Sequence, residues 1–469
     1  MEKNQMIIVG AVAAIVVIAA VAFVVLSNNG GGGGDDPTPG ARVGEEIKAA
    51  DYPNTSGRLW VYGNANEDDK IDASDLACIR DIIAGKIKAT QLADANADGK
   101  ITDADLEQVD KMIKAGKDTK LRVYYIDNYF KVAKIDWPIK TFATGFSSGF
   151  YAAEVAGVTD RIVLVDEMMN DGWKKLNSNT VDCETFGDEE APDWEKLLHS
   201  GIDVYVPGWC ESEADQLAPQ KLKGIDVMFM NTSDNWYVKF PNEYIDRSIT
   251  TFGYLIQGDM ARVYKWLDWH DDILAKLKVA AATIDDDDKA YMIQARTDPA
   301  HAPSGNYLFI GYNQTNSIHA EWAGVYSVAQ HDPLLAASNY PSITMEQIVT
   351  ILDRNVDSNN RIYFIDNENA GIVMYRDLNT TLQQWGSNMG KTDADIFYVG
   401  MTRELGNSAL YLIEMIFYQN LMYPQLTEIT GLDYAKELKY FIDNFAMEPE
   451  LYYEYIDMEQ WFKVLGEPN

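Results

Sequence analysis

Cysteine and histidine are scarce in this chain. Only 3 cysteines and 5 histidines occur among its 469 residues. Three cysteines are too few for a disulfide scaffold: Cys78 is expected to fill a small apolar position, while Cys183 and Cys210 fit a pair or two free thiols equally well. The histidines show neither tight ligand spacing nor a histidine-rich loop. A bare divalent-metal site is therefore only an alternative for this protein.

Positive charge is also in short supply. Lysine and arginine number 39 against 72 acidic residues, which gives a net charge of −33, and the acids are spread along the whole chain. Such a surface repels polyanions, which excludes DNA or RNA as a partner. With 47% hydrophobic and 12% aromatic residues, the chain has enough apolar material for two or three folded domains.

Two common catalytic motifs are absent from the sequence. It contains no Gly-x-x-x-x-Gly-Lys phosphate loop and no His-Glu-x-x-His helix. Carboxylate pairs are so abundant that their presence does not indicate a glycosidase. We therefore expect a protein that is not an enzyme.

Long uncharged apolar stretches are rare, and the longest lies at the start. No residue from Ile7 to Leu26 is charged; Lys3 precedes this run, and a glycine run and Asp35 follow it. This pattern predicts a transmembrane anchor over residues 1–28, with a cleaved signal segment as the alternative. Residues 29–58, rich in glycine and proline, are expected to form a tether. Either interpretation predicts that the rest is extracytoplasmic, and the anchor would hold it on the cell membrane.

Two twelve-residue loops carry oxygen ligands at calcium spacing. Positions 1, 3, 5 and 12 offer side chains, position 7 a main-chain carbonyl and position 9 a further side chain. The second loop has glycine at position 6, whereas the first has Asp69 there, so we expect weaker binding in the first loop. The predicted ligands of two calcium ions are Asn64, Asn66, Asp68, Lys70, Asp72 and Asp75 in the first loop, and Asp94, Asn96, Asp98, Lys100, Thr102 and Asp105 in the second.

Each loop is followed by a short helix with apolar periodicity, but no helix precedes it, unlike in a full EF-hand. This duplicated loop-helix unit, residues 59–120, resembles a dockerin module. The resemblance implies a small all-α, calcium-binding module that docks onto a cohesin-bearing protein. Positions 10 and 11, Ala73-Ser74 and Asp103-Ala104, do not identify that partner. We expect calcium removal to unfold this module and to leave the remainder intact.

From Leu121 onward, strand-like and helical segments alternate. Strands are expected at 122–126, 141–144, 161–166, 204–207 and 227–230, and again at 290–294, 307–310, 361–365, 372–374 and 396–399. Helical periodicity without proline runs from Tyr244 to Val279. The sequence thus predicts an α/β fold with two Rossmann-like lobes, 121–243 and 281–469, joined by one long interlobe helix over 244–280.

Several segments of both lobes, in this order, resemble the helix-linked, metal-chelate class of ABC-transporter solute-binding proteins. They begin at Phe142-Ala-Thr-Gly, Ala156-Gly-Val-Thr-Asp-Arg-Ile-Val, Pro192-Asp-Trp, Gly253-Tyr-Leu-Ile and Leu421-Met-Tyr-Pro. The resemblance implies capture of an iron-siderophore, haem or cobalamin-like chelate and its delivery to an ABC permease. A surface scaffold or adhesion protein that uses the dockerin-like module alone is the rival hypothesis.

Ligands of α/β sheets bind at the carboxyl ends of the strands. Residues expected at those ends, or near them, are the candidate solute contacts; aromatic faces suit a conjugated ligand and arginine suits its carboxylates. Packing in a core is the alternative for each aromatic residue. The candidates are Ser147, Ser148, Met168, Trp209, Trp236, Tyr237, Arg296, Trp322, Tyr326 and Arg403.

Overall fold

The computed structural model describes most of the chain. The described residues are 42–48, 52–53, 57–167, 169, 173–188, 190–208, 213–230, 244–296, 306–312, 314–338, 340–355, 361–366, 396–401, 408–456 and 462–465. The predicted anchor, 1–28, and the predicted strand 372–374 lie outside them. None of the helices in these ranges combines the length and the apolarity that a membrane crossing needs.

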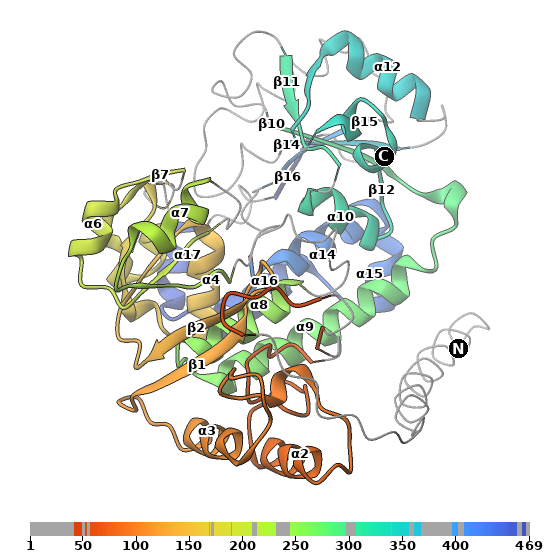
Figure 1. Cartoon of the computed structure of the whole chain (residues 1–469). Coiled ribbons are helices and arrows are strands. Elements are labelled where there is room, and N and C mark those ends of the chain that lie inside the picture. Colours follow the sequence, from red (N-terminus) through yellow and green to blue (C-terminus); the bar gives the residue numbers. More distant parts are fainter. Residues whose placement is uncertain are drawn as a thin grey trace.

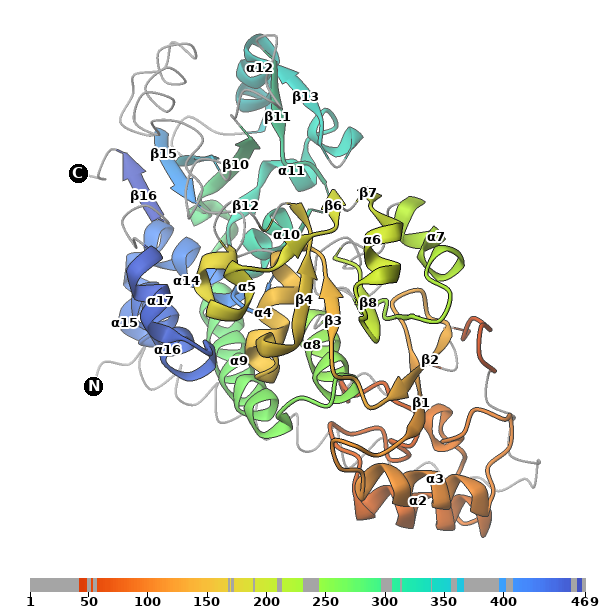
Figure 2. The ribbon, with the colours of Figure 1, turned by 90° about the vertical axis from the view of Figure 1, so that its left-hand side faces the viewer.

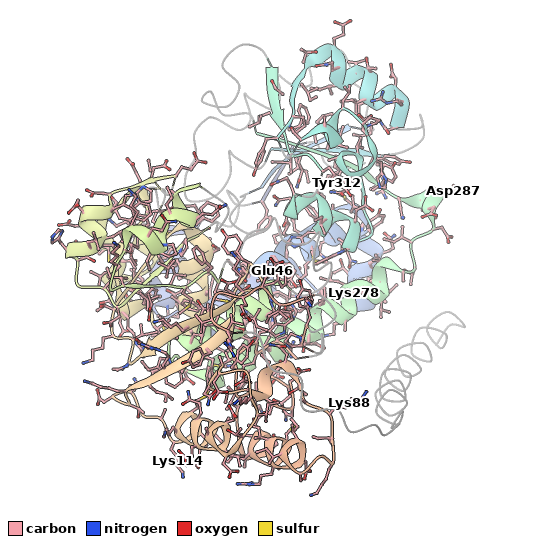
Figure 3. The ribbon with its side chains drawn as sticks, in the orientation of Figure 1. Glu46, Lys88, Lys114, Lys278, Asp287 and Tyr312 are labelled. Carbon is pink, nitrogen blue, oxygen red and sulfur yellow. The ribbon has the colours of Figure 1, made fainter. Side chains whose placement is uncertain are left out.

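The two predicted calcium loops each lead into a helix, α2 (Ala73–Ile83) and α3 (Asp103–Ile113). Their apolar faces meet around Ile79 and Val109, which are fully buried. Lys88, after α2, and Lys114, after α3, lie at opposite ends of the pair (Figure 3). The expected loop-helix repeat is therefore present.

The module packs against an antiparallel hairpin, β1 (Leu121–Ile126) and β2 (Val132–Trp137). The segment before the first calcium loop pairs with β1: the Tyr62 N–H donates to the Tyr124 carbonyl, and the Ile126 N–H donates to the Trp60 carbonyl. Figures 1 and 2 both show α2 and α3 beside this hairpin. Residues 122–126, predicted as part of a parallel α/β series, thus belong to a two-stranded antiparallel ribbon, because β2 follows within a few residues and pairs back onto β1.

The predicted tether, 29–58, is shorter than expected. Glu46 forms a β-bridge with Lys131, and the Ile47 N–H donates to the Phe130 carbonyl. Ile47 is 3% exposed and belongs to the main core. The described part of this segment is therefore docked on the hairpin, because it carries apolar side chains that the glycine run before it lacks.

The first lobe is built on a fully parallel five-stranded sheet with the order β5-β4-β3-β8-β9. The chain starts in the centre at β3, winds outward through β4 and β5, and then returns to the other side of β3 at β8. Its strands are β3 (Phe142–Thr144), β4 (Ile162–Val165), β5 (Glu184–Thr185), β8 (Val204–Val206) and β9 (Asp226–Val227), with the small ribbon β6 (Gly187–Asp188) and β7 (Ala191–Pro192) and the helices α4 (Phe146–Ala156), α5 (Ser178–Val181), α6 (Trp194–His199) and α7 (Glu213–Lys221).

The predicted single interlobe helix over 244–280 is wrong: the structure has two helices, α8 (Tyr244–Leu255) and α9 (Met260–Ala281). Gln257 adopts φ 56°, and the Gly258 N–H donates to the Gly253 carbonyl, which ends α8. Asp259 then caps α9 by accepting from the Ala261 N–H. The apolar periodicity continues across this break, which is why the sequence favoured one helix. The Gly258-Asp259 pair is the local signal that one helix ends and another begins.

The second lobe contains a mixed seven-stranded sheet, ordered β13-β11-β10-β14-β15-β16, with β12 also on β10. β10, β12, β14 and β15 run parallel to one another, β11 is antiparallel to both β10 and β13, and β16 is antiparallel to β15. The strands are β10 (Tyr291–Arg296), β11 (Asn306–Phe309), β12 (Tyr326–Ser327), β13 (Ser342–Thr344), β14 (Ile362–Asp366), β15 (Ile396–Met401) and β16 (Phe462–Leu465), and the helices of this lobe described before α14 include α10 (Thr315–Trp322), α11 (Val328–His331) and α12 (Met345–Asn355).

The last helices lead the chain back to the first lobe. They are α14 (Tyr411–Met422), α15 (Pro424–Thr430), α16 (Tyr434–Phe445) and α17 (Pro449–Tyr455). The Phe441 ring meets Tyr151 of α4 edge-on, and Glu448 accepts from the hydroxyl of Ser178 at 2.6 Å. One core thus runs from the module through both linker helices to α14 and α16. In Figure 1, α9 runs below α14 and α16 and above the module helices α2 and α3.

Candidate calcium loops and solute-binding edges

The second calcium loop is already closed by its own hydrogen bonds. The two carboxylate oxygens of Asp105, at position 12, accept from the N–H groups of Asn96 at 3.2 Å and Thr102 at 2.7 Å. Asp94, at position 1, accepts from the Gly99 N–H at 2.8 Å, and Gly99 has φ 88°. The ligand side chains are thus held around one centre by the loop backbone.

The first loop repeats most of this arrangement. Asp75 accepts from the N–H groups of Asn66 at 3.2 Å and Asp72 at 2.8 Å, as Asp105 does in the second loop. Asp68, at position 5, accepts from the Lys70 N–H at 2.7 Å. Hydrogen bonds within the first loop thus bring positions 3, 9 and 12 together.

The chemistry of both loops fits a cation. The side-chain oxygen Oδ1 of Asn64 is buried, with no hydrogen-bond partner among the described residues. Burial raises the pKa of Asp75 and of Asp94 to about 6, and it also raises the pKa of Asp105. Gathering buried carboxylates is unfavourable without a compensating charge. A hard divalent ion with oxygen ligands supplies that charge.

In the first lobe, the strand order reverses between β3 and β8, and such a switch point is where open α/β sheets hold ligands. Ser147 and Ser148 lie there, in the first turn of α4 directly after β3, and both are buried. The Ser147 hydroxyl makes no hydrogen bond within the described part of the chain. Buried Asp166, at the end of β4, accepts from the Phe146 N–H at 2.9 Å and fixes this turn.

In the second lobe, Arg296 is the last residue of β10, so its backbone reaches the carboxyl edge as predicted. Below this edge lies a buried polar group. Gln294 donates to the Tyr418 hydroxyl at 2.6 Å, and Glu414 lies 3.0 Å from His319 Nδ1 and accepts from Asn316 at 2.6 Å. These contacts join β10, α10 and α14, and they were missed because their members are far apart in the sequence.

Trp322 and Tyr326 do not join the serines and Arg296 at these edges. Tyr326 pairs with Tyr291, the first residue of β10, so it lies at the amino end of that strand. The Trp322 ring lies 5.9 Å from the amino group of Lys278, in the last turn of α9. Both positions follow from α10 running back along the sheet before β12 starts. The other candidates, Met168, Trp209, Trp236, Tyr237 and Arg403, lie outside the described residues.

Sequence reasoning also missed Arg58. It contacts Asp69 in the first calcium loop, Asp246 in α8 and Asp271 in α9. No local pattern indicates it, since two of these partners lie about 190 and 213 residues further along the chain. Cys78 and Cys183 are half-buried free thiols, whereas Cys210 lies outside the described residues.

These features define a class of protein: two α/β lobes, linked by helices, with a double calcium-loop module packed on the linker. Residues 62–114 match the family model described as dockerin type I domain. Solved structures similar in fold to about 70% of the chain include periplasmic binding proteins, one of them described as TroA-like, and both predicted resemblances are confirmed. No curated protein matches the chain.

Three of these structures illustrate the likeness. A periplasmic solute-binding protein from Veillonella parvula DSM 2008 is 14% identical, with a TM-score of 0.53 over 72% of this chain and 95% of its own. Helicobacter pylori CeuE, described with Ni(II) bound, is 14% identical at a TM-score of 0.52 over 72% and 100%. Haemophilus influenzae MolA, described as bound to molybdate, is 15% identical at 0.53 over 69% and 97%. Identities at this level establish the fold alone.

Proposed function

We propose that this protein is the solute-binding component of an ABC importer, and that it captures a metal chelate between its two lobes. The observation that carries the proposal is the fold itself: two lobes joined by helices, superimposing on almost the full length of periplasmic binding proteins. Two of the similar structures are described with a metal species, Ni(II) or molybdate. Siderophore, haem and cobalamin-like compounds remain the expected ligand classes.

The switch point of the first lobe supports an anionic or polar solute. The first turn of α4 offers the main-chain N–H groups of Ser147 and Ser148, since those of Gly145 and Phe146 already donate to Val206 and Asp166, and helix N-termini favour negative charge. The Ser147 hydroxyl adds a donor with no partner within the described residues. A chelate with peripheral carboxylates or phenolates provides the matching acceptors.

We further propose that the module binds two calcium ions and docks onto a cohesin-bearing partner, as dockerin modules do. The buried Asn64 oxygen and the raised carboxyl pKa values support a cation in each loop. The N-terminal apolar segment would hold the protein on the extracytoplasmic side of the cell membrane. The module would then place a solute-capturing body beside a second surface protein.

Native mass spectrometry of the purified full chain, before and after incubation with cell extract, tests the solute proposal. We expect a retained small molecule whose mass includes a metal. Titration with ferric chelates, haem and cobalamin, followed by tryptophan fluorescence, then ranks these classes. An unchanged mass, together with no fluorescence response to any of them, would contradict the proposed capture of a metal chelate.

A pull-down with immobilised cohesin domains tests the docking proposal. Binding should require calcium and should be lost on chelation, because calcium orders both loops. Equal recovery with and without calcium would contradict a dockerin-type mechanism.

A further inference from the structure

Arg58 joins the first calcium loop to both linker helices. On the loop side, its Nη2 donates to Asp69 Oδ2 at 2.6 Å, and its main-chain N–H donates to Asp69 Oδ1 at 2.7 Å. On the helix side, its Nη1 donates to both carboxylate oxygens of Asp271 in α9, at 2.8 and 2.9 Å, and lies 3.7 Å from Asp246 in α8. A single guanidinium, 15% exposed, therefore contacts three separate elements.

Asp69 can reach Arg58 because the peptide group between residues 68 and 69 has the opposite orientation to the matching peptide group of the second loop. In the second loop, the Gly99 N–H donates to Asp94 at position 1. In the first loop, position 1 is Asn64, whose amide Nδ2 donates to the Asp68 carbonyl at 2.6 Å. The carbonyl side of the peptide between residues 68 and 69 therefore faces the loop centre. Asp69 is not among the described residues with positive φ, so position 6 needs no glycine here.

The chain around Arg58 is packed closely against the loop and against α8. A Cβ atom on Gly57 would lie 1.9 Å from the carbonyl oxygen of Glu67. The Thr251 hydroxyl of α8 donates to the Arg58 carbonyl and accepts from the Trp60 N–H, both at 3.2 Å. The contact between module and linker is thus a fitted interface with hydrogen bonds on both sides.

Contacts continue from Arg58 into the second lobe. His270 Nδ1 lies 2.9 Å from Asp271 Oδ1, and His270 Nε2 lies 2.6 Å from the hydroxyl of Tyr411, the first residue of α14. The Tyr411 ring lies 4.7 Å from His319 of α10. His270, Tyr411 and His319 are all buried. A shift of Arg58 would therefore be felt in α8, α9 and α14 together.

We propose that calcium in the first loop, rather than in the second, braces α8 against α9 through Asp69 and Arg58. An ion held by Asn64, Asn66 and Asp68 fixes the backbone next to Asp69, and so fixes the carboxylate that positions Arg58. The module is then a calcium-dependent support of the interlobe linker in addition to a docking unit. This role goes beyond solute capture and rests only on the calcium binding proposed above.

Hydrogen exchange of the full chain, with calcium and with chelator, tests this brace. In the wild type, calcium should slow amide exchange in α8 and α9 by about fivefold or more, a usual size for coupling between sites. Asp68→Ala and Asp98→Ala form a matched pair, since both remove the ligand at position 5. Asp98→Ala should keep the calcium-dependent protection of α8 and α9, and Asp68→Ala should lose it. Equal behaviour of the two variants would overturn the proposal.

A second variant separates calcium binding from the brace. Asp69→Gly restores the residue usual at position 6, so calorimetry should still find two bound calcium ions, while the protection of α8 and α9 should fall to the level with chelator. Asp118→Gly, at an exposed position of the same module, is the control and should behave as wild type. Two bound ions with full protection in Asp69→Gly would refute the brace. No bound calcium in the wild type would instead refute the calcium binding itself.

Discussion

Replacing Arg58 by alanine should destabilise this protein far more than replacing an ordinary surface arginine. Asp246 is completely buried, and the Arg58 guanidinium lies 3.7 Å from its carboxylate. Removing one partner of a buried ion pair leaves an uncompensated charge and typically costs about 3–5 kcal/mol. Asp69 and Asp271 are 24% and 52% exposed, so water replaces much of what they lose. We therefore expect Arg58→Ala to lower the free energy of unfolding by about 3 kcal/mol.

Arg122 provides the matched control. It forms a two-pronged pair with Asp136 at 2.6 and 2.8 Å, but both side chains are about half exposed, so Arg122→Ala should cost less than about 1 kcal/mol. Urea unfolding in saturating calcium, followed by tryptophan fluorescence, measures both variants. Adding Asp246→Asn to Arg58→Ala should recover most of the lost unfolding free energy, because the buried side chain at position 246 is then uncharged. The reasoning fails if Arg58→Ala costs no more than Arg122→Ala, or if the double variant recovers nothing.

Three further predictions concern pH, packing and calcium. Burial raises the pKa of the Glu154 carboxyl to about 8, above its value of about 4.5 in the unfolded chain, so the folded state holds the proton more tightly. The contribution of Glu154 to stability is then full below about pH 4.5 and is lost as pH rises towards 8. Urea unfolding at a series of pH values should show that Glu154→Gln flattens this part of the plot of unfolding free energy against pH. An unchanged slope would contradict the raised pKa of Glu154. Gly57→Ala should cost about 1–3 kcal/mol through the clash with the Glu67 carbonyl, against less than about 0.5 kcal/mol for Gly116→Ala, which has open space around it; equal melting temperatures would count against the fitted interface. Chelation of calcium should lower the melting temperature of the lobes as well as that of the module, because they share one core, and a calorimetric scan in which the transition of the lobes stays fixed would show that they unfold independently.

The last of these predictions reverses an expectation drawn from the sequence. The loops were expected to unfold alone on calcium removal, since their repeat is self-contained in the sequence. Trp60 and Met112 from the module are instead buried in the same core as Tyr125 of the hairpin and Phe252 of α8. The sequence does not indicate which surface an apolar residue outside the repeat will cover. Only the folded chain therefore shows how many elements share one core.

Local features of this protein could be predicted because local interactions produce them. Ligand spacing within twelve residues fixes a calcium loop, and strand-sized apolar runs such as Ile162–Val165 recur wherever a sheet is buried on both faces. The same is true of the serines after β3, whose position at a strand end follows from chain order alone. The break between α8 and α9 also has a local sequence signal, Gly258-Asp259, but the apolar periodicity continues across it and favoured a single helix.

The sequence by itself determined the two calcium loops, the α/β lobes and the strand ends where a solute is expected. Only the tertiary structure decided that the module is fixed to the linker, that α16 returns to the first lobe, and that Trp322 lies away from the strand ends. Each of these depends on partners that chain order does not bring together, such as Arg58 and Asp271, 213 residues apart. Which of many distant carboxylates an arginine pairs with depends on how the whole chain packs. No short pattern of residues predicts that packing.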